Sequence, residues 1–238
     1  MSKKVDLSEK FAALRRAKSK SKMERAVNEY QRRLGLTYAE WVELASEQLE
    51  NVPDDKKEET IIALILLLRQ MLQADGRRFI TEGMHIGLGS TLPTPDLDRR
   101  LQNRLLENDN YMGNSLIPAV DERIRRTLAD PNIVGATAFA ASMMALQART
   151  ELYAGAMWTM MQDAIGEVSK QKEDPRIRWV LDDLAQHCPD CPRFAGEYDS
   201  FDAMLAATNG AMPGAGVQCN GNCRCHLEYI VNGEWTGP

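Results

Sequence analysis

The first 187 residues contain no cysteine, and all five cysteines of the 238-residue chain lie in its last quarter. The longest apolar run, residues 61–68, is eight residues long, far short of the roughly 20 that cross a bilayer. The opening residues, MSKKVD, carry no apolar stretch ahead of a small-residue cleavage site. We therefore expect a chain with no membrane partner that is not secreted and acts where it is made.

Recognisable catalytic motifs are also lacking. The sequence holds no Gly-x-Ser-x-Gly, no phosphate-binding P-loop and no His-Glu-x-x-His. The Cys188–Cys191 pair could in principle cycle as a redox dithiol, but no thioredoxin-like alternation of strands and helices surrounds it. We therefore predict that the protein is not an enzyme.

Charge is distributed unevenly along the chain. Residues 1–35 hold 11 Lys and Arg against 4 Asp and Glu, a net charge of +7, so the remainder carries −12 of the total of −5. Such a basic arm could contact nucleic acid phosphates or an acidic protein surface, and a solvated helix is the other interpretation. Only Phe11 and Tyr30 could supply rings for base stacking there.

Hydrophobic periodicity predicts a mainly α fold with long helices in the N-terminal region. A capping box at Thr37 to Glu40 indicates a helix start, and glycines at 83, 87 and 89 indicate a loop or hinge. The methionines at 143, 144, 157, 160 and 161 predict core packing. The predicted helices cover residues 38–50, 56–74, 97–107, 116–128, 137–168 and 201–207, the last with Ser200 as its cap.

The C-terminal segment differs from this helical pattern. Alternating residues near 177–181 and 223–231 predict two strands that pair antiparallel. The sequence thus predicts a basic N-terminal arm at 1–35, a helical domain at 36–170 and a small α+β C-terminal module at 171–238.

The cysteines are spaced as metal ligands. Two of them form a Cys-x-x-Cys turn, and after 27 further residues a second cluster follows; the five are Cys188, Cys191, Cys219, Cys223 and Cys225. Two thiolates in a tight turn and two from a distant segment can complete a tetrahedral zinc site. Four of the five would bind a structural Zn²⁺, and which four stays open. His187 and His226 could replace a thiol or lie beside the ligands.

A family resemblance rests on an ordered set of motifs. Arg149-Thr150-Glu151 lies in a predicted long helix, Trp179 follows some 30 residues later, and then come Cys188-Pro189-Asp190-Cys191 and Cys223-Arg224-Cys225. In this order the motifs resemble the Mu F-like minor head proteins, the phage head morphogenesis proteins, over roughly residues 140–230. This chain has Cys219-Asn220-Gly221-Asn222 where the family often has a proline-histidine-proline-like element.

The resemblance implies a minor structural component of a tailed-phage capsid. Such a protein acts near the portal during head assembly in the host cytoplasm and stays in the virion, in the head interior or at the portal vertex. Its partners would be the portal or the major capsid protein, with packaged DNA as a further partner of the basic arm. Arg149, Glu151 and Trp179 would give structural support to the zinc module. In one hypothesis Arg149 binds carbonyls of the cysteine turns and Glu151 accepts a donor from the Trp179 strand; in the other, Arg149 and Glu151 are ordinary surface charges. The alternative from another class is a zinc-ribbon protein that binds nucleic acid directly.

Overall fold

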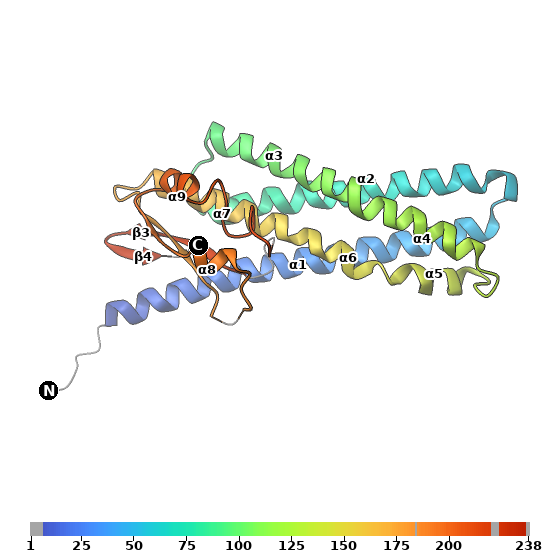
Figure 1. Cartoon of the computed structure of the whole chain (residues 1–238), viewed down its shortest axis with the longest axis horizontal. Helices are drawn as coiled ribbons and strands as arrows, with labels where there is room; N and C mark the ends of the chain where they lie inside the picture. Colours follow the sequence, from blue (N-terminus) through green and yellow to red (C-terminus); the bar gives the residue numbers. More distant parts are fainter. Residues whose placement is uncertain (1–6, 184, 220–223, 237–238) are drawn as a thin grey trace. The chain divides into compact units, whose positions relative to one another are not determined.

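The structure, a computed structural model, describes residues 7–183, 185–219 and 224–236, with side chains from residue 21 onward except that of Glu151. It is mainly α-helical with one small antiparallel sheet, which confirms the predicted fold class (Figure 1). Among the described residues, no helix combines the length and the apolar character needed to cross a membrane. The helices are α1 (Leu7–Asn51), α2 (Lys57–Leu88), α3 (Pro95–Tyr111), α4 (Ile117–Ala129), α5 (Ala136–Met144), α6 (Gln147–Glu151), α7 (Gly155–Lys170), α8 (Asp190–Phe194) and α9 (Phe201–Ala207).

The chain divides into two compact units. The sheet unit consists of Met1–Val27, Ile80–Gln102 and Gly155–Pro238, and the helical unit consists of Asn28–Phe79 and Asn103–Ala154. Helices α1, α2 and α3 each contribute residues to both units. The predicted three-part division of the chain, with boundaries at residues 36 and 171, stays a prediction.

Helix α1 begins far ahead of the predicted start at residue 38. Its buried side chains recur every three or four residues from Met23 through Val27, Tyr30 and Leu34, so one apolar stripe keeps the chain helical. Thr37, predicted to cap a helix, instead lies inside α1, where its hydroxyl donates to the Asp75 carboxylate at 2.5 Å. Packing of the stripe therefore overrides the local capping signal.

Helix α2 also runs past its predicted end. The predicted loop begins at Gly83, yet Gly83 and Gly87 both lie inside α2, which ends at Leu88. A Cβ atom at Gly87 would lie 2.5 Å from the Met161 carbonyl oxygen. These glycines therefore permit close approach to α7 and do not break the helix, whereas Gly89, with φ at +60°, follows its end.

The predicted long helix at 137–168 is divided into α5, α6, a short 3-10 turn at Leu152–Ala154 and α7. The first break follows Met143, whose carbonyl accepts both the Tyr38 hydroxyl and the Leu146 amide. Because this carbonyl also accepts a side-chain hydroxyl, the backbone forms a 3-10 type hydrogen bond, from residue i+3 to residue i, and the α-helix does not continue. Tertiary contact thus overrides the high helix propensity of the sequence.

The sheet has four antiparallel strands in the order β2-β1-β3-β4, and they lie beside α7, α8 and α9 in Figure 1. The predicted antiparallel pair is confirmed as β1 (Ile177–Val180) and β3 (His226–Val231), with Val180 opposite His226. The two outer strands, β2 (Gly196–Tyr198) and β4 (Glu234–Thr236), were not predicted. Asn232 and Gly233 join β3 to β4 with positive φ angles, a hairpin signal that the sequence does contain.

Helix α7 is the centre of the sheet unit. Every residue from Met157 to Ser169 is buried, including the predicted core methionines 157, 160 and 161. The buried carboxylates on this helix are paired: Asp163 with Arg100 at 3.2 Å, and Glu167 with Lys170 at 3.0 Å. Pairing is required because an unpaired buried charge is costly.

Across the sheet, Arg178 on β1 and Glu228 on β3 form a cross-strand ion pair. Glu228 is 3% exposed, and the Nε atom of Arg178 donates to it at 2.6 Å. Burial alone would raise the pKa of Glu228, but hydrogen bonds from His226 and Arg178 hold that pKa below its usual value. The carboxylate is therefore ionised and depends on Arg178.

Replacing Arg178 with methionine should lower the free energy of unfolding by about 3 kcal/mol, because Glu228 would be left buried without its counter-charge. Arg176→Met is the matched control, since Arg176 pairs with Asp174 at an exposed site, and it should cost under about 1 kcal/mol. Urea unfolding followed by circular dichroism measures both. Equal losses for the two variants would contradict the role assigned to Arg178.

Candidate metal centre

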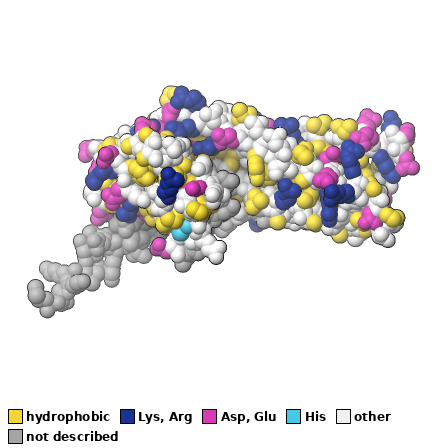
Figure 2. Space-filling model, viewed as in Figure 1, with side chains coloured by type: hydrophobic (Ala, Val, Ile, Leu, Met, Phe, Trp, Pro, Cys, Tyr) yellow, Lys and Arg dark blue, Asp and Glu magenta, His cyan; other side chains and the backbone are white. Residues whose placement is uncertain are grey.

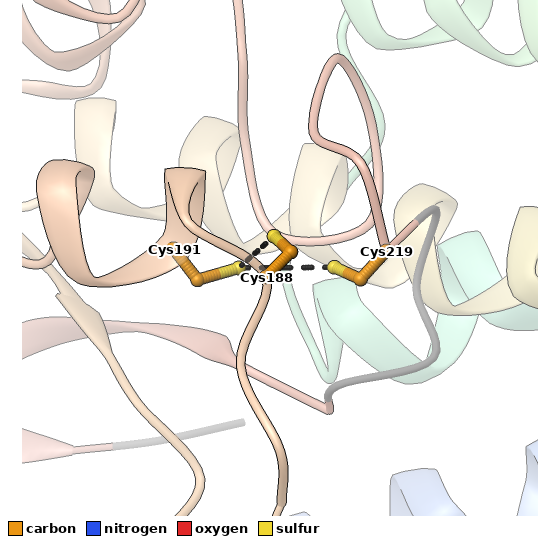
Figure 3. A group of neighbouring side chains, drawn as sticks. All are labelled: Cys188, Cys191 and Cys219. Atoms are coloured by element: carbon orange, nitrogen blue, oxygen red, sulfur yellow. Dashed lines mark hydrogen bonds between the residues drawn. The ribbon is translucent and has the colours of Figure 1, made fainter.

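Three cysteines from two distant segments converge on one point in the sheet unit. The Sγ atoms of Cys188 and Cys191 lie 3.5 Å apart, and those of Cys191 and Cys219 lie 3.7 Å apart. All three sulfurs lie within 4.8 Å of one another, and their side chains point toward a common centre (Figure 3). The predicted closure of the 27-residue gap is thus present in the structure.

The separations of the sulfurs fit a tetrahedral ion. Metal–sulfur bonds of about 2.3 Å at tetrahedral angles place sulfurs about 3.8 Å apart. No disulfide joins the four described cysteines, Cys188, Cys191, Cys219 and Cys225, to one another. The cluster is therefore a possible thiolate metal site, and an ion could bind its three sulfurs without rearrangement of the backbone.

Short local structure presents each thiol. Cys188 precedes α8, Cys191 lies within α8, and the turn between them brings both sulfurs to one side. Cys219 comes from the loop that follows α9, and this loop is tied to the turn by the Gln218 amide, which donates to the Asp190 carboxylate at 3.0 Å. Asp190, one of the two residues between the paired cysteines, thus joins the two segments without any ion.

The surroundings of Cys188 favour its thiolate. Burial opposes ionisation, but amide hydrogen bonds from Cys191, Cys219 and Asp190, together with the Cys191 thiol, lower the Cys188 pKa from its ordinary 9.0 to about 7. A folded-state pKa below the unfolded value stabilises the metal-free fold as pH rises from about 7 to 9, and this gain is lost as pH falls through 7. A thiolate at neutral pH is the form that binds metal.

Cys225 lies beside this group but outside the set of three. It is fully buried, and its Sγ atom lies 3.5 Å from the Nδ1 atom of His187, the residue that precedes Cys188. His187 thus contacts one cysteine of the second cluster, and its place beside bound ligands stays a prediction. Cys223 lies outside the described residues.

The remaining predicted residues have other surroundings. Trp179 is 2% exposed on β1 and packs its ring 5.8 Å from that of Phe194 on α8. Arg149 is exposed and donates to the Ser115 hydroxyl at 3.3 Å, while the Glu151 side chain lies outside the described set. The support that Arg149 and Glu151 would give to the zinc module stays a prediction.

His226 lies next to Cys225 in sequence but pairs with an acid. Its Nε2 atom lies 3.4 Å from the Glu228 carboxylate, and its Nδ1 atom is buried without a hydrogen-bond partner in the part of the chain described. His226 and Glu228 have the His-x-Glu spacing that zinc deaminases use, where the glutamate transfers protons. Here Glu228 is instead engaged by Arg178.

Two residues near the site carry no signal in the sequence. Trp158 and Gln162 on α7 read as ordinary helix positions, yet the Trp158 indole donates to the Cys225 carbonyl at 2.9 Å. The Gln162 side-chain oxygen accepts the Leu227 amide at 2.7 Å. Only the tertiary arrangement of α7 and β3 brings these groups together.

Comparison with known proteins adds no relative to this picture: no protein-family model, no curated protein and no solved structure matches the chain.

In metal-free protein, Cys188 should be alkylated by iodoacetamide with a midpoint at about pH 7, because only the thiolate reacts and the local amides favour it. Mass spectrometry of peptides after short pulses at several pH values measures the profile for each cysteine. A Cys188 midpoint near 9, the ordinary value for a thiol, would show that these amides do not act on its sulfur.

Proposed function

We propose that the chain is a structural minor head protein of a tailed bacteriophage, which acts near the portal and is held together in its C-terminal part by a structural Zn²⁺ ion. The observation that carries the proposal is the convergence of Cys188 and Cys191, the first cysteine pair of the head-protein motifs, with Cys219, which lies in the stretch where this chain departs from the family pattern. The order of Arg149, Trp179 and the two cysteine motifs supports the assignment to head morphogenesis.

Zinc is the ion that best suits the ligands. Thiolate sets select zinc or iron–sulfur clusters, and zinc takes four such ligands in a closed tetrahedron. Cys225 supplies the fourth thiolate in this proposal, because it is fully buried and adjoins His187 beside the other three. Four sulfurs fill the shell and leave no position for water or substrate, which supports a structural and not a catalytic ion.

The energetics favour such an ion in this segment. Closing the loop between Cys191 and Cys219 costs about 3 kcal/mol in chain entropy. The four strands are three to six residues long, too short to offset much ordering by themselves. Structural zinc contributes on the order of 10 kcal/mol in small peptides, which exceeds that cost.

Purified wild-type protein should hold one Zn²⁺ per chain, with four thiols protected from titration until a chelator is added. Cys191→Ser and Cys225→Ser should each lose most of the ion, because each removes one of the four ligands. Elemental analysis paired with thiol titration measures both quantities.

Cys223→Ser is the control for this experiment, since a non-ligand cysteine can be removed without loss of zinc. If Cys225→Ser kept its zinc and Cys223→Ser lost it, the fourth ligand would be Cys223 and not Cys225. Absence of stoichiometric zinc from the wild-type protein would overturn the metal centre altogether.

A role in head assembly requires attachment to the portal or capsid, and the basic residues between 15 and 22 are the proposed contact. Deleting residues 1–35 would remove the buried Met23, Val27, Tyr30 and Leu34, so deletion would damage the fold. Neutralising the charges leaves those residues in place. Figure 2 shows basic and acidic side chains of the described residues interspersed.

Changing Arg15, Arg16, Lys18, Lys20 and Lys22 to glutamine should reduce co-purification of the protein with empty proheads several-fold, because it removes five positive charges from the proposed contact. Quantitative immunoblotting of gradient-purified proheads measures the retained copies. The control is the Lys56→Gln, Lys57→Gln variant, which should be retained normally.

If the variant with five substitutions were retained on proheads as well as the wild-type protein, the basic residues between 15 and 22 would not be the contact that attaches the protein. Salt-dependent binding of the wild-type chain to DNA, with no association with proheads, would instead favour the nucleic-acid-binding alternative.

A further inference from the structure

We infer that Trp158 and Gln162 on α7 are positioning residues for the metal centre, which hold the segment 224–227 in place before the ion binds. The inference rests on the metal centre proposed above and adds how its distant half is organised. In this inference the segment that carries Cys225 is held by hydrogen bonds to the protein core. The segments that carry Cys188, Cys191 and Cys219 are brought into their final positions by the bound ion.

The anchor consists of two hydrogen bonds from the buried part of α7. Trp158 and Gln162 are both 0% exposed and lie one helical turn apart on α7, so they face the same neighbour. The Trp158 indole donates to the carbonyl of Cys225, and the Gln162 oxygen accepts the amide of Leu227. The Cys225 carbonyl and the Leu227 amide belong to successive peptide groups, so the two bonds fix the backbone where β3 begins.

Arg224 strengthens the same anchor. Its φ angle of +56° turns the backbone just ahead of Cys225, in a region that favours glycine. Its guanidinium lies 5.4 Å from the centre of the Trp158 ring, within the range of a cation–π contact. Trp158 therefore contacts both the backbone of Cys225 and the side chain of the residue before it.

The other half of the centre has weaker support. Cys191 is buried, but Cys188 and Cys219 are only partly buried, and α8, which carries Cys191, is five residues long. The hydrogen bond that joins their segments runs from the Gln218 amide to Asp190 at an exposed position. A ligand that is already in place loses less conformational freedom on binding, so the anchored half should raise metal affinity.

Trp158→Phe tests the inference because it keeps a buried ring and removes the N–H donor. Loss of one such bond should weaken Zn²⁺ affinity about tenfold. The measurement is competition against a chelator of known affinity, with Co²⁺ absorption as a check on the geometry of the sulfur ligands. Gln162→Leu, which leaves the Leu227 amide without its acceptor, should weaken affinity similarly.

Trp41→Phe is the matched control. Trp41 is also fully buried, and its indole N–H donates to the Leu64 carbonyl in the helical unit, so the substitution removes a similar volume and a similar hydrogen bond outside the sheet unit. The metal-free forms of both tryptophan variants should unfold at similarly reduced temperatures, whereas only Trp158→Phe should lose affinity. Equal affinities in the two variants would overturn the inference, while a wild-type protein that takes up no zinc would overturn the metal centre instead.

Hydrogen exchange on the wild-type protein tests the inference without any substitution that could prevent folding. After chelation, the Leu227 amide should stay protected, because Gln162 and not the ion holds it. The Gln218 amide lies next to Cys219, in a segment that the ion holds. In the metal-free protein this amide should exchange at least tenfold faster than in the zinc-bound form. Comparable loss of protection at both amides would show that the segment 224–227 is not held in advance.

Discussion

The burial of every α7 residue from Met157 to Ser169 is the constraint on which the sheet unit depends. A helix segment that has no solvent-facing side must find partners for its charged groups within the protein. Asp163 and Glu167 find them in Arg100 and Lys170, and the oxygen of Gln162 finds one in the Leu227 amide. The polar residues of α7 therefore determine where α3 and β3 lie, in addition to filling the core.

The small sheet and the cysteine cluster depend on each other through this helix. β3 pairs with β1 on one side and with β4 on the other, and its first residue directly follows Cys225. The buried pair of Arg178 and Glu228 fixes the register between β1 and β3, because a one-residue slip would separate the two charges. The register in turn fixes how far Cys225 lies from the turn that carries Cys188.

Patterns within a few residues were sufficient to predict the main classes of structure. The Cys-x-x-Cys turn, the strand pair and the Ser200 cap, whose side chain accepts the Ala203 amide, all follow from local spacing. Interruptions and extensions of helices could not be predicted this way. The helix is interrupted after Met143 because the Met143 carbonyl accepts the hydroxyl of Tyr38, a residue 105 positions away. The glycines of α2 are needed because α7 packs too closely for a Cβ atom. The Asn232-Gly233 hairpin was predictable and shows that a turn signal can be missed when the flanking strand is only three residues long.

The tryptophans give this protein an internal optical probe. Trp41 is fully buried in the helical unit and donates to the Leu64 carbonyl, whereas Trp158 and Trp179 are buried in the sheet unit. Trp235 is partly exposed and lies against Arg178, with 4.7 Å between the guanidinium and the ring centre. Emission from the intact chain thus combines three shielded indoles and one that solvent can reach, so that a quencher added to the solution would reach the C-terminal hairpin before it reached either core.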